Sequence, residues 1–226
     1  MEARIVLVVG AGSGLGQATA FELHKAGFTV VAVDRTEAGL KELPDGIHRE
    51  VADATDPTVP GPLVERVVAS IGAPDVLVNT IGAYEIGDAL SVTPQTLQRM
   101  MDVNLGAALW LTQAVAPYMR SAGSGVIVHV AARPGVEPTA GAAAYGVSKA
   151  ALVHLVRTLD VELRPHGIRV NAVVPQLIAT EKNRSFLPPE VMASAVEPSV
   201  IAEVIAFLVS DAAASISGAL VPTYGG

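Results

Sequence analysis

The sequence predicts a single α/β domain in which helices cover both faces of a doubly wound parallel sheet. Short apolar runs rich in β-branched residues alternate with helical patterns along the whole chain, as in βαβ units. Half of the 226 residues are hydrophobic but only 4% are aromatic, which suits buried strands and close-packed helices built from Ala, Val, Leu and Ile. A glycine-rich turn joins the first apolar run to the first helical pattern.

In the first half of the chain, short apolar runs end at polar or turn-forming residues, as buried parallel strands do. Apolar residues at helical spacing (Ala18, Phe21 and Leu23) follow the glycine-rich turn, and Gly27 ends that helix. This half is predicted to contain strands at 4–9, 28–33, 47–51 and 75–79, and helices at 14–26 and 63–71.

The second half continues the alternation with longer helices. Small and apolar residues recur at helical spacing, and Pro165-His166-Gly167 ends one of these helices. This half is predicted to contain strands at 125–130, 168–174 and 218–221, and helices at 96–120, 143–163 and 199–210. No linker or internal repeat divides the chain, so residues 1–226 are interpreted as one domain.

The composition disfavours several classes of protein. A net charge of −7 disfavours a nucleic-acid surface, which would carry a basic stripe. The chain has no cysteine, which excludes disulfides and thiolate metal sites, and its histidines lack the spacing of metal ligands. No apolar stretch approaches the roughly 18 residues of a membrane span, and no leader-like segment opens the sequence. We therefore expect a cytoplasmic protein without a metal, membrane or nucleic-acid partner.

The turn Gly10-Ala-Gly-Ser-Gly-Leu-Gly16 follows the first predicted strand and opens the first helix. Its glycines let the backbone approach a pyrophosphate, whose charge is stabilised by the helix N-terminus. Asp34 ends the second strand about 20 residues further on, the spacing of a carboxylate that binds the adenosine ribose. Asp34 would repel a 2′-phosphate, so we expect NAD rather than NADP, although Arg35 beside it is able to hold that phosphate.

Tyr145 and Lys149 lie one helical turn apart and therefore share a face of their predicted helix. The unperturbed pKa of a phenol is about 10, and a neighbouring ammonium lowers it by favouring the phenolate. We therefore expect Lys149 to lower the pKa of Tyr145, so that Tyr145 exchanges a proton with an alcohol near neutral pH. The alternative is that the two residues only share one face of an amphipathic helix.

Together these features resemble the short-chain dehydrogenase/reductase family over essentially the whole chain. Gly10, Gly14 and Gly16 match the family's cofactor turn, and Tyr145 and Lys149 match its catalytic pair. The resemblance implies a Rossmann fold, a nicotinamide cofactor, and oxidation or reduction of a small molecule at a CH–OH carbon.

Four further motifs match the family in the correct order. Asp53 falls where the family places an adenine-contacting aspartate, and Asn79 and Gly82 fall in the segment that usually reads Asn-Asn-Ala-Gly. Asn104 matches the asparagine that holds a water in the proton relay, and Thr180 matches the threonine that contacts the nicotinamide carboxamide. By resemblance, the cofactor contacts are Gly10, Gly12, Ser13, Gly14, Leu15, Gly16, Asp34, Arg35, Asp53, Ala54, Asn79, Gly82, Lys149 and Thr180.

The sequence departs from the family at the catalytic serine, because Ala132 occupies that position. The serine donates a hydrogen bond to the substrate oxygen, and losing one such donor costs on the order of 10²–10³ in rate. Thr139, Ser148, Thr80 and a bound water are alternative donors. Arg133 is a candidate to bind a carboxylate or phosphate of the substrate, or else is a solvated loop arginine.

Other predictions concern the substrate side and the surface. Tyr84 is predicted to line the substrate pocket, with ordinary packing as the alternative, and His129 is interpreted as a packed strand residue. Residues 176–198, in which Gln176 replaces a family glycine, are predicted to form a lid over the substrate. The helices at 96–120 and 143–163 match those that pack subunits together in the family, so we expect a homodimer or homotetramer.

The sequence therefore predicts an NAD-dependent oxidoreductase that interconverts a secondary alcohol and a ketone. By resemblance, Tyr145 is the acid/base, Lys149 also binds the nicotinamide ribose, and Asn104 anchors the relay water. The alternative is a catalytically weak or inactive family member that binds NAD(H) as a sensor or scaffold, which the alanine at position 132 favours.

Overall fold

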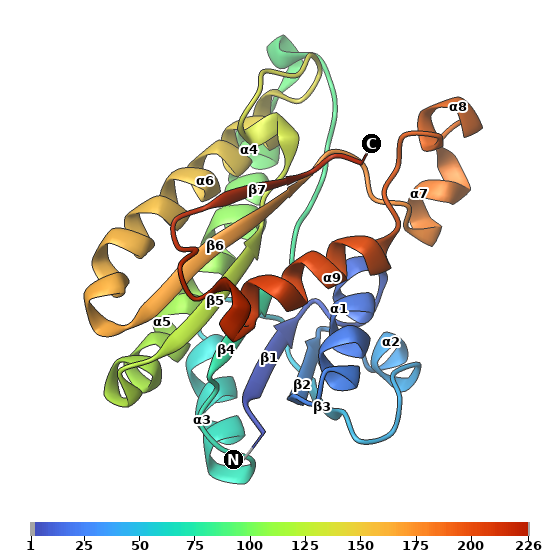
Figure 1. Ribbon diagram of the computed structural model, residues 1–226. Coiled ribbons are helices and arrows are strands. Elements are labelled where there is room, and N and C mark those ends of the chain that lie inside the picture. The colour runs from blue at the N-terminus through green and yellow to red at the C-terminus, as the bar shows by residue number, and fades with distance from the viewer. Residues whose placement is uncertain (1–2, 226) are drawn as a thin grey trace.

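Seven parallel strands form one sheet in the order β3-β2-β1-β4-β5-β6-β7 (Figure 1). The computed structural model describes residues 3–225 and confirms the predicted doubly wound α/β fold. The strands are β1 (Ile5–Val9), β2 (Thr29–Asp34), β3 (His48–Val51), β4 (Val76–Asn79), β5 (Gly125–Val130), β6 (Ile168–Pro175) and β7 (Leu220–Thr223). Because all strands are parallel and the order reverses between β1 and β4, a ligand site is expected at their carboxyl ends there.

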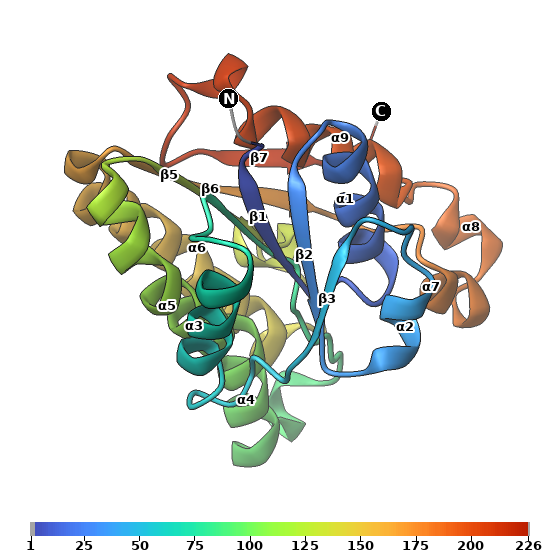
Figure 2. The ribbon, with the colours of Figure 1, turned by 90° about the horizontal axis from the view of Figure 1, so that it is seen from below.

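Helices cover both faces of this sheet, as predicted. Figure 2 shows α1, α2 and α9 on one face and α3, α5 and α6 on the other. The helices are α1 (Gly14–Lys25), α2 (Glu37–Lys41), α3 (Pro60–Ser70), α4 (Pro94–Met101), α5 (Ala107–Ala122), α6 (Ala143–Leu163), α7 (Glu181–Phe186), α8 (Pro189–Met192) and α9 (Pro198–Val209). Among residues 3–225, no helix combines the length and apolarity needed to cross a membrane.

Two apolar cores hold the layers together, one on each face of the sheet. Alternate strand residues point to opposite faces, so Leu7 packs with the α3, α5 and α6 side while Val6 packs with the α1 and α9 side. Leu111 of α5 and Ile205 of α9 are fully buried in these two cores. Burying one such side chain stabilises the fold by about 1.5–3 kcal/mol. The sheet is therefore a rigid base for the residues at its carboxyl edge.

The predicted helix at 96–120 is wrong in its middle. The structure divides it into α4 and α5, with a π-helical turn at Asp102–Gly106 between them. A π-turn adds a residue to the helical repeat and is frequent at functional sites. Here it contains Asn104, whose buried amide bonds to two other segments, so tertiary contacts accompany the irregularity.

Three short helices, α2, α7 and α8, were not predicted. Each has four to six residues, too few to show a helical period in the sequence. Local contacts define them instead, as at α7, where the Thr180 side chain accepts a hydrogen bond from the backbone N–H of Asn183 (3.2 Å). The last strand also lies slightly later than predicted, at Leu220–Thr223.

Candidate active site

The turn after β1 brings backbone against backbone at the start of α1. Gly10 has a φ of +87°, which favours glycine, and its N–H donates to Val33 O (2.9 Å). A Cβ on Gly16 would overlap the carbonyl oxygen of Gly10, so this close approach requires glycine. Ser13 is the N-cap residue of α1, and Leu15 is buried in its first turn. The turn is thus an open backbone cradle at a helix N-terminus, which suits a phosphate group.

Asp34 lies at the end of β2 and faces this turn. Its Oδ2 accepts a hydrogen bond from Gly12 N–H (3.0 Å), while Oδ1 accepts from the N–H and hydroxyl of Thr36 (both 3.1 Å). These bonds fix the carboxylate beside the glycine turn and leave lone pairs on both oxygens for ribose hydroxyls. Arg35 is exposed, and among residues 3–225 it has no ion-pair partner.

The other predicted cofactor residues surround the turn from neighbouring strands. Asp53 follows β3 and accepts from Thr55 N–H (3.0 Å) and Thr55 Oγ1 (2.6 Å), beside the buried Ala54. A Cβ on Gly14 would lie 3.0 Å from Thr180 Cγ2, so Thr180, in the segment that follows β6, lies against the turn. The backbone cradle and the adjacent carboxylate fit a dinucleotide.

Asn104, Lys149 and Gly82 meet between β4 and β5. A Cβ on Gly82 would lie 3.3 Å from Lys149 Nζ and 3.4 Å from Asn104 Oδ1. Lys149 is 3% exposed, and its Nζ donates to Val130 O (2.8 Å) at the end of β5. Burial disfavours the charged amine and lowers the pKa of Lys149 to about 8. The structure therefore places a buried amine, which loses its proton more easily than a free lysine does, next to the buried amide.

The Asn104 amide ties α4–α5 to two other segments. Its Oδ1 accepts from Ala83 N–H (2.9 Å), and its Nδ2 donates to Ala83 O (3.0 Å) and to Ser148 Oγ (2.9 Å). Ser148 in turn donates to the carbonyl oxygen of Tyr145 (2.7 Å). Sequence reasoning missed this role of Ser148, because its spacing from Asn104 along the chain carries no signal of contact.

Tyr145 differs from the prediction in the direction of its pKa shift. Burial raises the pKa of Tyr145 well above that of a free phenol, and the neighbouring Tyr84 raises it further. The two rings meet edge to face, with centroids 4.9 Å apart and an interplanar angle of 89°. The expected lowering of the Tyr145 pKa by Lys149 is therefore wrong, because desolvation of the phenolate dominates.

His129 is a buried strand residue, as predicted, and contacts the cofactor side through Asn79. Thr112 Oγ1 donates to Ala108 O (2.8 Å), so it accepts from His129 Nε2 (3.3 Å) and leaves Nδ1 to accept from Asn79 Nδ2 (3.5 Å). Asn79 Oδ1 meanwhile accepts from Ile81 N–H (3.0 Å). Burial, followed by the charge of Lys149, lowers the pKa of His129 to about 3 and keeps it neutral.

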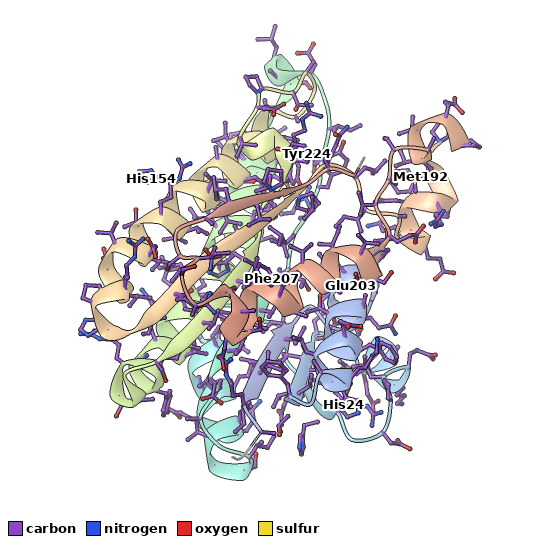
Figure 3. The ribbon with its side chains drawn as sticks, viewed as in Figure 1. His24, His154, Met192, Glu203, Phe207 and Tyr224 are labelled. Atoms are coloured by element: carbon purple, nitrogen blue, oxygen red, sulfur yellow. The ribbon has the colours of Figure 1, made fainter. Side chains whose placement is uncertain are left out.

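On the substrate side, Ala132 is 4% exposed and offers no hydrogen-bonding side chain. Arg133 beside it donates from Nε to Glu137 Oε2 (2.7 Å) and from Nη1 to Gln176 Oε1 (2.7 Å). Its guanidinium also lies 5.0 Å from the ring centroid of Tyr224, a residue labelled in Figure 3. Arg133 thus links the end of β5, the start of the predicted lid and the segment after β7.

The predicted lid, residues 176–198, contains α7 and α8 and leaves the body at a narrow base. Ile178 and Val196 form a parallel bridge, and Arg184 pairs with Glu197. Phe186 at the end of α7 is 58% exposed. These contacts join the two ends of the segment and bury Ala179 and Val196, while Phe186 and Val191 stay exposed.

No group of three or more His, Cys, Asp or Glu side chains that could hold a metal ion occurs within the described range 3–225. His24 on α1 and His154 on α6, both labelled in Figure 3, belong to helices on opposite faces of the sheet. His24 and His154 are therefore too far apart to coordinate the same metal ion.

A family model described as short chain dehydrogenase matches residues 4–190. The chain therefore belongs to the short-chain dehydrogenase/reductase family, as its motifs predicted. It is 31% identical to the 3-oxoacyl-[acyl-carrier-protein] reductase FabG of Thermotoga maritima, covering 100% of this chain and 98% of the relative. It is 34% identical to L-xylulose reductase of Homo sapiens, covering 99% of this chain and 96% of the relative.

Solved structures agree with this assignment. The 3-ketoacyl-(acyl-carrier-protein) reductase from Brucella melitensis complexed with NADH has a TM-score of 0.93 and 30% identity, covering 100% of this chain and 98% of that chain. A putative NAD(P) dependent gluconate 5-dehydrogenase from Beutenbergia cavernae, with bound NADP, has a TM-score of 0.89 and 31% identity, covering 98% and 95%. Structural relatives thus bind either nicotinamide cofactor.

Proposed function

We propose that this protein interconverts a secondary alcohol and a ketone with NAD as its cofactor. The observation that carries the proposal is the meeting of Asn104, Lys149 and the Tyr145 helix at the carboxyl edge of the sheet, beside a backbone cradle that fits a dinucleotide. Relatives named as reductases of 3-oxoacyl groups and of L-xylulose support carbonyl chemistry.

The preference for NAD rests on Asp34. Its carboxylate is fixed by Gly12 and Thr36 at the end of β2, so a 2′-phosphate would meet a negative charge that is not free to turn away. Both oxygens keep lone pairs for the 2′- and 3′-hydroxyls of the adenosine ribose. Arg35 is the residue that would weaken this preference, because its side chain is exposed beside the same site.

A nicotinamide cofactor held by the turn after β1 and by Asp34 would supply the hydride for reduction of a carbonyl carbon. Tyr145 gives its proton to the carbonyl oxygen; burial raises its pKa, so the phenol is protonated at neutral pH but is a weaker acid than a free phenol. Lys149 uses one N–H on Val130 O and keeps its other hydrogens for the nicotinamide ribose. The Asn104 amide hydrogens are both used, so it is an Oδ1 lone pair that would accept from the relay water.

Two surface features complete the proposal. Residues 176–198 act as the lid over the substrate, since their apolar residues include the exposed Phe186. The helices α5 and α6 pack two or four copies together, and Val147 and Val161 of α6, 57% and 73% exposed, support such a contact. A monomeric mass in sedimentation at micromolar concentration would contradict the oligomer.

A cofactor and substrate screen tests this function. NADH and NADPH are titrated calorimetrically, and L-xylulose, acetoacetyl-CoA and cyclohexanone are offered with each cofactor while absorbance at 340 nm is followed. We expect tighter binding of NADH and turnover of at least one ketone. Tighter binding of NADPH would contradict the cofactor assignment.

The second candidate is a protein that binds NAD(H) as a sensor or scaffold with little or no turnover. The observation that favours it is the buried Ala132, which has no hydrogen bond to give where the family uses serine. Tight NADH binding with no turnover in the screen, by the wild type and by Ala132→Ser alike, would select this candidate.

A further inference from the structure

Ala132 leaves the candidate active site one hydrogen-bond donor short. The residue lies immediately after β5 and is 4% exposed, so the site is defined there but carries only a methyl group. A carbonyl oxygen that gains negative charge is stabilised most by two donors, of which Tyr145 is one. A second donor would have to come from another group near Tyr145.

Two of the donors suggested by the sequence are occupied elsewhere. Ser148 Oγ donates to Tyr145 O (2.7 Å) and accepts from Asn104 Nδ2 (2.9 Å), which uses its single hydrogen inside α6. Thr80 Oγ1 lies within reach of Val9 O (2.9 Å) and Gly10 O (3.2 Å), beneath the glycine turn. Neither hydroxyl is free to bond a substrate.

Thr139, the third suggested hydroxyl, and the neighbouring Arg133 are also poorly suited. Thr139 is exposed, and its Oγ1 contacts Glu137 O (3.4 Å) in the loop before α6. Arg133 is directed to Glu137 and Gln176, with both bonds at 2.7 Å. A bound water is the one alternative from the sequence that needs no side chain, and a donor supplied by the protein itself has to come from a different segment.

Tyr84 lies directly against Tyr145. Their rings are edge to face with centroids 4.9 Å apart, and Tyr84 is 59% exposed, so it borders the solvent side of the tyrosine. Within residues 3–225 neither phenol hydroxyl has a hydrogen-bond partner. Partial burial raises the pKa of Tyr84, so its hydroxyl keeps its proton near neutral pH and is available as a donor.

The segment that carries Tyr84 is fixed on both sides. Before it, both polar groups of the Ala83 backbone bond to the Asn104 amide (2.9 and 3.0 Å). After it, Gly87 N–H donates to Gly141 O (2.8 Å), just before the helix α6 that carries Tyr145. Tyr84 therefore has a defined position relative to the site, which a hydrogen-bond donor to a reacting atom needs.

We propose that the Tyr84 hydroxyl donates to the substrate oxygen the hydrogen bond that Ala132 is unable to give. This inference rests on the proposed oxidoreductase function. During reduction, hydride adds to the carbonyl carbon, the C=O π electrons move to oxygen, and that oxygen takes the proton of Tyr145. Tyr84 keeps its own proton and only stabilises the developing charge. Tyr84 is then a catalytic residue that replaces the family serine from a different loop.

A double-mutant cycle with Tyr84→Phe and Ala132→Ser tests this exchange. Both variants keep the surrounding shape, and Tyr118→Phe serves as a matched control, because it removes a phenol hydroxyl on α5. Rates are measured with NADH and whichever of L-xylulose, acetoacetyl-CoA and cyclohexanone the wild type reduces fastest. NADH affinity is measured by calorimetry.

We expect Tyr84→Phe to lower kcat on the order of 10²-fold, with NADH affinity unchanged and Tyr118→Phe close to wild type. Ala132→Ser should recover at least about tenfold of that loss in the Tyr84→Phe background and gain less in the wild type, because only one position needs to donate. Equal gains in both backgrounds, or a Tyr84→Phe rate within about threefold of wild type, would overturn the proposal.

Failure of the underlying function has a different signature. If the wild type and Ala132→Ser bind NADH but reduce none of the three ketones, the oxidoreductase function fails and the role of Tyr84 fails with it. If the wild type reduces a ketone but the effects of Tyr84→Phe and Ala132→Ser simply add, the oxidoreductase function stands. Tyr84 then only lines the site. Should Tyr84→Phe be unstable, a large gain from Ala132→Ser alone would still count against the proposal.

Discussion

The cofactor side and the substrate side of the carboxyl edge are built in different ways. On the cofactor side, backbone groups of the turn at residues 10–16 form the cradle, and Asp34 is held by hydrogen bonds to backbone and hydroxyl groups. On the substrate side, exposed side chains define the surface, and Ala132 and Gln176 depart from the family pattern. A backbone cradle tolerates little change in sequence, whereas a hydrogen bond from a side chain can move from one loop to another.

The largest effect should come from closing the cradle. Gly16→Ala would place a Cβ onto the carbonyl oxygen of Gly10, so the turn must open. We expect NADH affinity to fall by on the order of 10²-fold or more, since the phosphate site is lost. Gly61→Ala is the matched control, because a Cβ there meets nothing within 4 Å. If calorimetric titration finds that both variants bind NADH as tightly as the wild type, the turn at residues 10–16 is not part of the cofactor site.

A smaller effect should come from the charge of the cradle's carboxylate. Asp34→Asn keeps the shape and an acceptor oxygen for Gly12 N–H but removes the charge that repels a 2′-phosphate. We expect the ratio of NADPH to NADH dissociation constants to fall by on the order of 10-fold. Asp53→Asn, at an exposed turn after β3, is the control and should change this ratio little. If the ratio of NADPH to NADH dissociation constants is unchanged in Asp34→Asn, the charge of Asp34 is not the cause of a preference for NAD.

The smallest effect concerns His129, which hydrogen-bonds to Asn79 and whose pKa is lowered by burial and by the charge of Lys149. Folding lowers its pKa from 6.5 to about 3, so between these pH values the unfolded chain binds a proton that the folded chain does not. Stability therefore rises with pH through this window and is lost on acidification. His129→Asn should remove this contribution, about 3 kcal/mol between pH 7 and pH 4.

Urea unfolding of the His129→Asn variant at pH 7 and pH 4 measures that difference. His154→Asn, at an exposed position on α6, is the control and should lose as much stability as the wild type. If His129→Asn also loses as much as the wild type, the histidine is not kept neutral by burial.

The fold was largely predictable because its strands are buried on both faces. Runs such as residues 28–33 are apolar except for Thr29, and the structure places β2 at Thr29–Asp34. The π-turn at Asp102–Gly106 was not predictable, because the groups that accompany it, Ala83 and Ser148, come from other parts of the chain. Tertiary contacts, which a local pattern does not contain, decide such features.

The candidate site shows the same division. Glycine spacing and Asp34 predict a cofactor site at the turn after β1, and the structure brings these residues together there, because the turn needs those residue types at those positions. The contact between Tyr84 and Tyr145 has no local signal, since it depends on how the loop after β4 lies against α6. The direction of the Tyr145 pKa shift was missed for a related reason, because helical spacing reveals a neighbour and not the depth of burial.

The most direct test of the oxidoreductase function compares the wild type with Tyr145→Phe. Both are titrated with NADH by calorimetry and then assayed at 340 nm with L-xylulose, acetoacetyl-CoA and cyclohexanone. We predict equal NADH affinity and a kcat that is lower in the variant by on the order of 10²–10⁴-fold, because the phenylalanine has no proton to give. Equal rates in the two proteins, or tight NADH binding by a wild type that reduces none of the ketones, would contradict the proposed function.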